Sequence, residues 1–142
     1  MGNNVTPVDE EVTFADVGAE NKSVVTRTDL DGVITFANRT FCKLAGYEKD
    51  ELVGQQHSIV RHPDMPKAAF ENMWDTIKKN QKWHGFVKNL RKDGKYYWTE
   101  AFVEPLFDEN GQKIGYMAAR KPVGLKDKEE FEKKYQEMKA KE

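Results

Sequence analysis

The side chains best suited to chemistry lie in a short segment rich in proline and histidine. Arg61, His62 and Asp64 follow one another between Gln55 and Pro66, where the sequence has neither helical nor strand periodicity. An arginine can bind two phosphate oxygens through its planar guanidinium, and a histidine can donate a further hydrogen bond. The segment is therefore a candidate site for a dinucleotide. The alternative is a surface ion pair of Arg61 with Asp64, in which Asp64 also caps the next helix.

Asn89 is a second polar residue whose position needs an explanation, because it lies inside a strand-like run. Asparagine is disfavoured within strands, yet Lys88 and Leu90 continue the pattern that extends from Trp83 to Arg91. Its side-chain amide both donates and accepts hydrogen bonds. We therefore interpret it as facing the edge of a heterocyclic ring, with a solvated polar position as the alternative.

The turn at 92–94 decides which residues of the next strand share a face with Asn89. A two-residue turn would place Trp98 opposite Asn89, whereas a three-residue turn with Gly94 as a bulge would place Tyr97 there. We expect the second register.

This register predicts a cavity wall made of small side chains. Thr99, Ala101 and Val103 would then face the same side of the sheet as Gly85 and Val87. Their small size leaves room for a ligand against the strands.

The same register turns Trp98 and Phe102 to the outer face of the sheet. An apolar stripe there needs a cover, which the N-terminal cap, the final helix or a partner subunit can supply. A homodimer through this face or through the terminal segments is therefore among the expectations.

Other candidates have a structural interpretation beside the functional one. Trp74 lies on the apolar stripe of a helix and suits core packing, whereas Trp83, at a strand start, is better placed to stack on a ring. Asn38 follows a strand and is expected to be a helix N-cap, with a role in supporting the pocket. Cys42, beside Phe41, is interpreted as a buried structural thiol.

The three histidines fit no zinc-binding spacing. His57, His62 and His84 are too irregularly placed for a tetrahedral site. His62 remains a candidate axial ligand for haem, which is the main cofactor alternative.

The sequence predicts an α+β arrangement. Strand-like runs lie at 23–28, 33–37, 83–91, 96–106 and 113–121. Helical segments at 38–46, 48–53 and up to 79 fall between the second and third strands, and a charged helix follows from 126. A five-stranded antiparallel sheet with helices inserted after strand 2 is therefore expected, plus a C-terminal helix.

We divide the chain into an N-terminal cap or tail (1–21), a central domain (22–122) and a charged C-terminal signalling helix or linker (123–142). The net charge is -1, from 23 basic and 24 acidic residues, which argues against nucleic-acid binding. With one cysteine, no secretory signal and no spanning segment, a cytoplasmic location without direct membrane contact is expected.

The order of turns and strands, with Asn38, Gly46-Tyr47, Gly54, the 92–94 turn and Trp98, resembles a PAS domain over residues 22–122. Within it, His57-Ser58-Ile59-Val60-Arg61-His62-Pro63-Asp64-Met65-Pro66-Lys67-Ala68-Ala69-Phe70 resembles the signature of aerotaxis receptors. Trp74, Trp83, Gly85, Val87-Lys88-Asn89 and Tyr97-Trp98 continue that match.

This resemblance implies a module that binds FAD, reports cellular redox state and is not an enzyme. Its partner would be a downstream chemoreceptor signalling domain, in cis or in trans, and the full-length protein could be associated with a membrane. Arg120 is a charge within the last strand that would favour an anionic reduced flavin, unless it is solvated at the strand end. The implied cofactor-binding residues are Arg61, His62, Asp64, Asn89, Trp83, Asn38, Phe70, Trp74, Thr99 and Arg120. A haem gas sensor and a cofactor-free interaction module are the alternatives.

Overall fold

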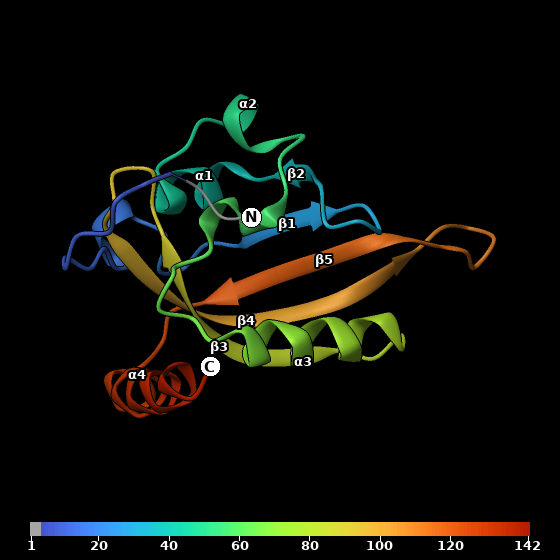
Figure 1. Cartoon of the computed structure of the whole chain (residues 1–142). Coiled ribbons are helices and arrows are strands. Elements are labelled where there is room, and N and C mark those ends of the chain that lie inside the picture. Colours follow the sequence, from blue (N-terminus) through green and yellow to red (C-terminus); the bar gives the residue numbers. More distant parts are fainter. Residues whose placement is uncertain (1–3) are drawn as a thin grey trace.

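A five-stranded antiparallel sheet forms the centre of the computed structural model, which describes residues 4–142 (Figure 1). Its strands run in the spatial order β2-β1-β5-β4-β3. Their bounds are β1 Val24–Thr28, β2 Ile34–Ala37, β3 Trp83–Leu90, β4 Tyr96–Phe107 and β5 Lys113–Lys121. The expected α+β class and strand number are confirmed.

The helices fall where the sequence predicts them. Helices α1 (Arg39–Ala45), α2 (Lys49–Leu52), the 3-10 helix η2 (His57–Val60) and α3 (Lys67–Lys78) follow β2, and α4 (Leu125–Ala140) follows β5. Asn38 caps α1, because its side-chain Oδ1 accepts the backbone N–H of Phe41 at 3.0 Å. No helix within residues 4–142 has the length and apolarity needed to cross a membrane.

The β3–β4 hairpin adopts the expected register. Asn89 lies opposite Tyr97, and Val87 lies opposite Thr99. Gly94 has a φ of +91°, a conformation that favours glycine. The side-chain alternation of a strand then places Asn89, Tyr97 and Thr99 on one face and Trp98 on the other.

Helix α4 covers the outer face of the sheet at Trp98. Of the three covers that the sequence allowed, the final helix is therefore the one found at this position. The rings of Trp98 and Tyr135 are stacked with centroids 6.2 Å apart. The Tyr135 hydroxyl also donates to the backbone oxygen of Phe86 at 2.7 Å. In Figure 1, α4 lies apart from α1 and α2, beyond the β3–β4 end of the sheet.

The N-terminal segment is docked on the domain, although its sequence predicted only a loose cap. The backbone N–H of Tyr96 donates to the backbone oxygen of Glu10 at 3.0 Å. The backbone N–H of Val12 donates to the backbone oxygen of Tyr96 at 2.8 Å. Phe14 and Ala19 are buried in the core. Such backbone pairing needs no side-chain periodicity, which explains why no pattern revealed it. Residues 1–3 of the expected tail lie outside the described residues.

Candidate functional site

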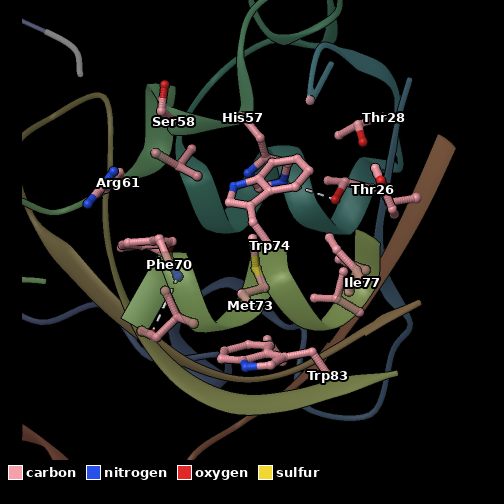
Figure 2. A pocket seen from close by; sticks show the side chains of 18 of the residues that line it. Thr26, Thr28, His57, Ser58, Arg61, Phe70, Met73, Trp74, Ile77 and Trp83 are labelled. Atoms are coloured by element: carbon pink, nitrogen blue, oxygen red, sulfur yellow. Dashed lines mark hydrogen bonds between the residues drawn. The ribbon is translucent and has the colours of Figure 1, made fainter. Parts of the chain in front are cut away.

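A cavity of about 170 Å³ lies between helix α3, the 3-10 helix η2 and the inner face of the sheet (Figure 2). The sheet supplies its small residues, and η2 and α3 supply the opposite wall. Thr99 and Ala101 of β4 line it, as the predicted register required. The small side chains of β4 thus leave the space that the sequence predicted.

One end of the cavity is polar, because Arg120 of β5 projects into it. Its Nη2 donates to Thr26 Oγ1 at 3.0 Å and lies 2.9 Å from Nε2 of His57. Its Nη1 donates to the backbone oxygen of Ala118 at 3.2 Å. Arg120 is only 8% exposed, so the alternative of a solvated strand-end charge is wrong.

The charge at this end is not balanced by a carboxylate. None of the residues among 4–142 that line the cavity is acidic, and the hydrogen-bond partners of Arg120 are a hydroxyl, an imidazole and a carbonyl. Burial lowers the pKa of Arg120 to about 10, which leaves it cationic at neutral pH. Burial and the charge of Arg120 lower the pKa of His57 to about 3, so His57 is neutral and accepts at Nε2. The cavity therefore favours a ligand that carries or gains negative charge.

Asn89 faces the cavity from β3. Its Nδ2 makes two long contacts, at 3.4 Å to Thr99 Oγ1 and 3.5 Å to the Val87 oxygen. Asn89 is 7% exposed and its backbone pairs with that of Arg61, which lays the 61–66 segment along β3. An amide so weakly engaged is free to bond a ring edge.

Aromatic rings form much of the remaining wall. Trp74 on α3 contacts Tyr116 edge-on, with centroids 5.5 Å apart. Trp83 starts β3, and its indole N–H donates to Asn72 Oδ1 at 2.8 Å. Figure 2 places Trp74 and Trp83 at different levels of the cavity, with Met73 between them. Both tryptophans predicted to flank a cofactor therefore line the cavity.

A second depression, a groove of about 790 Å³, adjoins the cavity on the outer side of α3. Arg61, Phe70 and Trp74 line both spaces. The guanidinium of Arg61 lies over the Phe70 ring, 4.0 Å from its centroid. This pair thus stands where the inner cavity meets the groove.

Basic side chains outnumber acidic ones along the groove. Its wall includes four cationic residues and two carboxylates. The cationic residues are Arg61, Lys67, Lys78 and Lys139, and the acidic ones are Glu71 and Asp75. The groove therefore suits an anionic group better than a cationic one.

His62 lines the groove and not the inner cavity. It is 4% exposed, and its Nδ1 accepts the backbone N–H of Asp64 at 3.0 Å. Burial and nearby Lys88 lower the pKa of His62 to about 4, against the opposing charge of Asp64. The imidazole is therefore neutral.

Asp64 lines neither space, although the sequence placed it among the binding residues. Its Oδ2 lies 3.0 Å from Nζ of Lys88, whose side chain is 9% exposed. The same Lys88 Nζ lies 3.8 Å from Glu132 of α4. Asp64 therefore connects the groove segment to β3 and, through Lys88, to α4. The alternative of an ion pair with Arg61 is replaced by the pair with Lys88.

Asn38 is also outside the cavity. Besides capping α1, its Oδ1 accepts the N–H of Val25 at 3.2 Å and its Nδ2 donates to the Ser23 oxygen at 2.9 Å. The two polar residues that contact Arg120 through their side chains were missed in return. His57 was considered only as a metal ligand, and Thr26 was read only as part of a strand. Their pairing with Arg120 depends on strand pairing between β1 and β5, which spacing along the chain does not reveal.

Comparison with known proteins decides the family. The family model described as the PAS fold matches residues 34–120, which is more than half of the chain. The chain belongs to the PAS family. The recognition made from the sequence is confirmed at this level.

This PAS domain has curated relatives among bacterial regulators. It is 50% identical to the aerotaxis receptor of Escherichia coli over 102 residues, covering 72% of the chain and 20% of that protein. It is 27% identical to the nitrogen fixation regulatory protein of Klebsiella pneumoniae over 101 residues, covering 71% of the chain and 20% of that protein. The PAS domain thus spans about a fifth of the length of these relatives.

Solved structures confirm the PAS fold. A light-oxygen-voltage domain studied with a flavin analogue superposes with a TM-score of 0.67 at 22% identity, covering 81% of this chain and 86% of that one. The light state of the blue-light photoreceptor Aureochrome1 domain gives a TM-score of 0.66 at 26% identity, covering 85% and 92%.

Proposed function

We propose that this PAS domain binds FAD and reports the redox state of the flavin to a downstream signalling domain. The observation that carries the proposal is the junction at Arg61 and Phe70, where the small inner cavity meets a wider, basic groove. A ligand with a planar ring and a long anionic tail fits both spaces at once. The identity of half the matched residues with an aerotaxis receptor supports this choice.

The inner cavity fits the ring system. Its exposed wall area is largely apolar, as in most small-molecule sites, and its polar side chains include Arg61, Asn89 and the group around Arg120. Asn89 would bond the ring edge, and Trp83 would contact the ring. A flavin supplies electron transfer when it is bound, and the fixed charge of Arg120 favours the more negative form of any group held beside it.

The groove favours FAD over a shorter flavin. The diphosphate of FAD would meet Arg61 and the lysines that line this groove, because phosphate oxygens accept charge-assisted hydrogen bonds. His62 would contribute through its remaining ring nitrogen, Nε2. Asp64 would act indirectly, by holding the segment in place through Lys88.

The position of His62 favours flavin over haem in the inner cavity. His62 faces the groove, with Nδ1 engaged by Asp64. The histidine that lines the cavity is His57, and its Nε2 lies 2.9 Å from Arg120 Nη2. Neither imidazole offers an axial nitrogen inside the cavity, so we retain flavin as the proposal.

The output would leave through α4 and the outer face of the sheet. Trp98 and Lys88 contact α4 from strands whose neighbouring residues, Asn89 and Thr99, line the cavity. A change at the ring edge is thus one residue away from the helix contact. In a longer protein the receiving domain would be a chemoreceptor signalling module, and we propose a cytoplasmic location for this part.

The decisive measurement is the absorption spectrum of the freshly purified protein before and after dithionite. Bands near about 370 and 450 nm that bleach on reduction identify a flavin. Heat release followed by phosphodiesterase treatment distinguishes FAD from FMN, because cleavage of FAD raises the fluorescence. Arg61→Ala should lose FAD while Lys22→Ala, at an exposed position outside both spaces, should keep it.

A single intense band near about 400–430 nm would instead identify haem. A colourless protein that also fails to take up added FAD would leave the cofactor-free module as the better account. A full flavin load in both Arg61→Ala and Asn89→Ala would contradict the site proposed here.

A further inference from the structure

Trp83 lies directly over Gly85 on the inner face of β3. A Cβ atom at Gly85 would be 2.3 Å from Cη2 and 2.4 Å from Cζ2 of the Trp83 indole. Real side chains do not approach so closely, so the benzene part of the indole occupies the space that any other residue at position 85 would fill. Gly85 therefore allows the indole to lie along its own strand.

The indole is held in this position from the other side of the cavity. Its N–H donates to Oδ1 of Asn72 on α3 at 2.8 Å. Asn72 is exposed and lines neither the cavity nor the groove. A tryptophan with its N–H bonded has a defined orientation, whereas an unbonded indole must find another partner or turn. The bond thus ties β3 to α3 across one end of the cavity.

The inner face of β3 gains a flat aromatic surface from this arrangement. Residues 83, 85, 87 and 89 alternate onto that face, and Gly85 is the position without a side chain. The indole covers this position, and the chain then continues to Val87 and Asn89, both of which line the cavity. A planar ring bonded to Asn89 and lying along β3 would therefore meet the indole and not bare backbone.

We propose that Asn72 is a positioning residue for the ring-binding cavity, because its hydrogen bond keeps the Trp83 indole over Gly85 in contact with a bound heteroaromatic ring. The identity of the ring in this inference rests on the proposed function. The position of the indole is independent of it. Asn72 itself does not touch the ligand. It acts through Trp83, and Gly85 provides the room.

The test uses Asn72→Leu and Asn72→Asp in the full chain. Leucine removes the acceptor, whereas aspartate retains a carboxylate oxygen that can accept the indole N–H. We expect Asn72→Leu to weaken FAD binding by about three- to tenfold, the range of one ordinary hydrogen bond. Flavin fluorescence should also become longer-lived, because contact with an indole quenches it. Asn72→Asp should have an FAD affinity and a flavin fluorescence lifetime close to those of the wild type.

A second readout needs no flavin. The protein has three tryptophans, so an indole ¹H–¹⁵N spectrum has three signals, which Trp83→Phe assigns to residue 83 by elimination. In Asn72→Leu the Trp83 signal should shift and its proton should exchange faster, while the Trp74 and Trp98 signals stay in place. Gly85→Ala should displace the Trp83 signal although Asn72 is intact.

Each outcome decides a different point. An unchanged Trp83 signal in Asn72→Leu would overturn the positioning role. A displaced signal with unchanged FAD affinity and lifetime would overturn the contact between indole and ring. Wild-type protein that takes up no FAD would overturn the proposed function instead. The indole spectra would then test only whether Asn72 fixes the position of the Trp83 indole.

Discussion

Arg120 and His57 meet at the polar end of the cavity with 2.9 Å between Nη2 and Nε2. The arginine carries the charge and the histidine is neutral, because burial and that charge hold the pKa of His57 near 3. Two residues from β5 and η2 thus form a cationic site in which no acid takes part. A ligand that gains an electron there meets a fixed positive charge.

The first prediction concerns this charge. If the proposed flavin is bound, Arg120→Met should lower its reduction potential, because the more negative reduced form loses its compensating cation. A tenfold change in the preference for that form corresponds to about 59 mV for a one-electron step, and we expect a shift of that order. Potentiometric titration measures it. Arg120→Lys is the control, since it keeps the charge; an equal shift in both variants would assign the effect to packing.

The second prediction concerns stability at low pH. The pKa values of His57 and His62 in the fold, about 3 and about 4, lie below the unfolded value near 6.5. Between about pH 6.5 and pH 4 the unfolded chain therefore binds protons that the folded chain does not, and the free energy of unfolding falls as pH falls. The limit is about 1.4 kcal/mol per pH unit for each histidine.

Urea denaturation at pH 7.5, 6 and 5 measures this slope. His57→Gln and His62→Gln should each make it shallower, because each removes one group that titrates differently in the two states. Identical slopes in wild type and in both variants would show that neither histidine is buried in its neutral form.

The third prediction concerns Gly94. An alanine there would adopt a φ of +91° and place its Cβ 2.5 Å from the backbone oxygen of Thr6. We expect Gly94→Ala to lower the free energy of unfolding by roughly 1–3 kcal/mol, because it combines backbone strain with a clash against the docked N-terminal segment. Gly111→Ala shares the positive φ but meets nothing within 4 Å, so it should cost less. Equal losses would mean that the N-terminal segment is not in place.

The fourth prediction concerns the docking of α4. Tyr135→Phe removes the 2.7 Å hydrogen bond to the Phe86 oxygen and keeps the ring stacked on Trp98. Docking should weaken by about 1 kcal/mol. Hydrogen exchange of α4 amides should then be faster, with little change in β1 and β5. Gln136→Ala, at an exposed position of the same helix, serves as the control and should leave the exchange rates nearly unchanged.

Local patterns sufficed for the fold. The helix stop at Gly46, the cap at Asn38 and the turn at Gly94 each act within a few residues, so the sequence predicted the elements and the hairpin register. The docking of the N-terminal segment was not predicted, because its contact with Tyr96 is made by backbone atoms.

The site was only partly predictable for a related reason. Asn89 stood out because its residue type conflicts with a strand, and that local conflict led to the cavity. The partnership of Arg120 with His57 and Thr26 joins positions 63 and 94 residues apart, and no local rule relates them. Asp64 was assigned to the cofactor through the family resemblance, which does not show that its spatial neighbour is Lys88.

Lys88 is a buried cation with two acidic partners, Asp64 in the groove segment and Glu132 on α4. If α4 leaves, Glu132 goes with it, and Asp64 alone must compensate the charge. A ligand in the groove that changes the position of Asp64 would therefore change the docking of α4, and by thermodynamic reciprocity the docking of α4 would change the affinity for that ligand by the same factor. Removing α4 from the protein would then perturb ligand binding in two ways, because it would also take away Lys139, the one α4 residue that lines the groove.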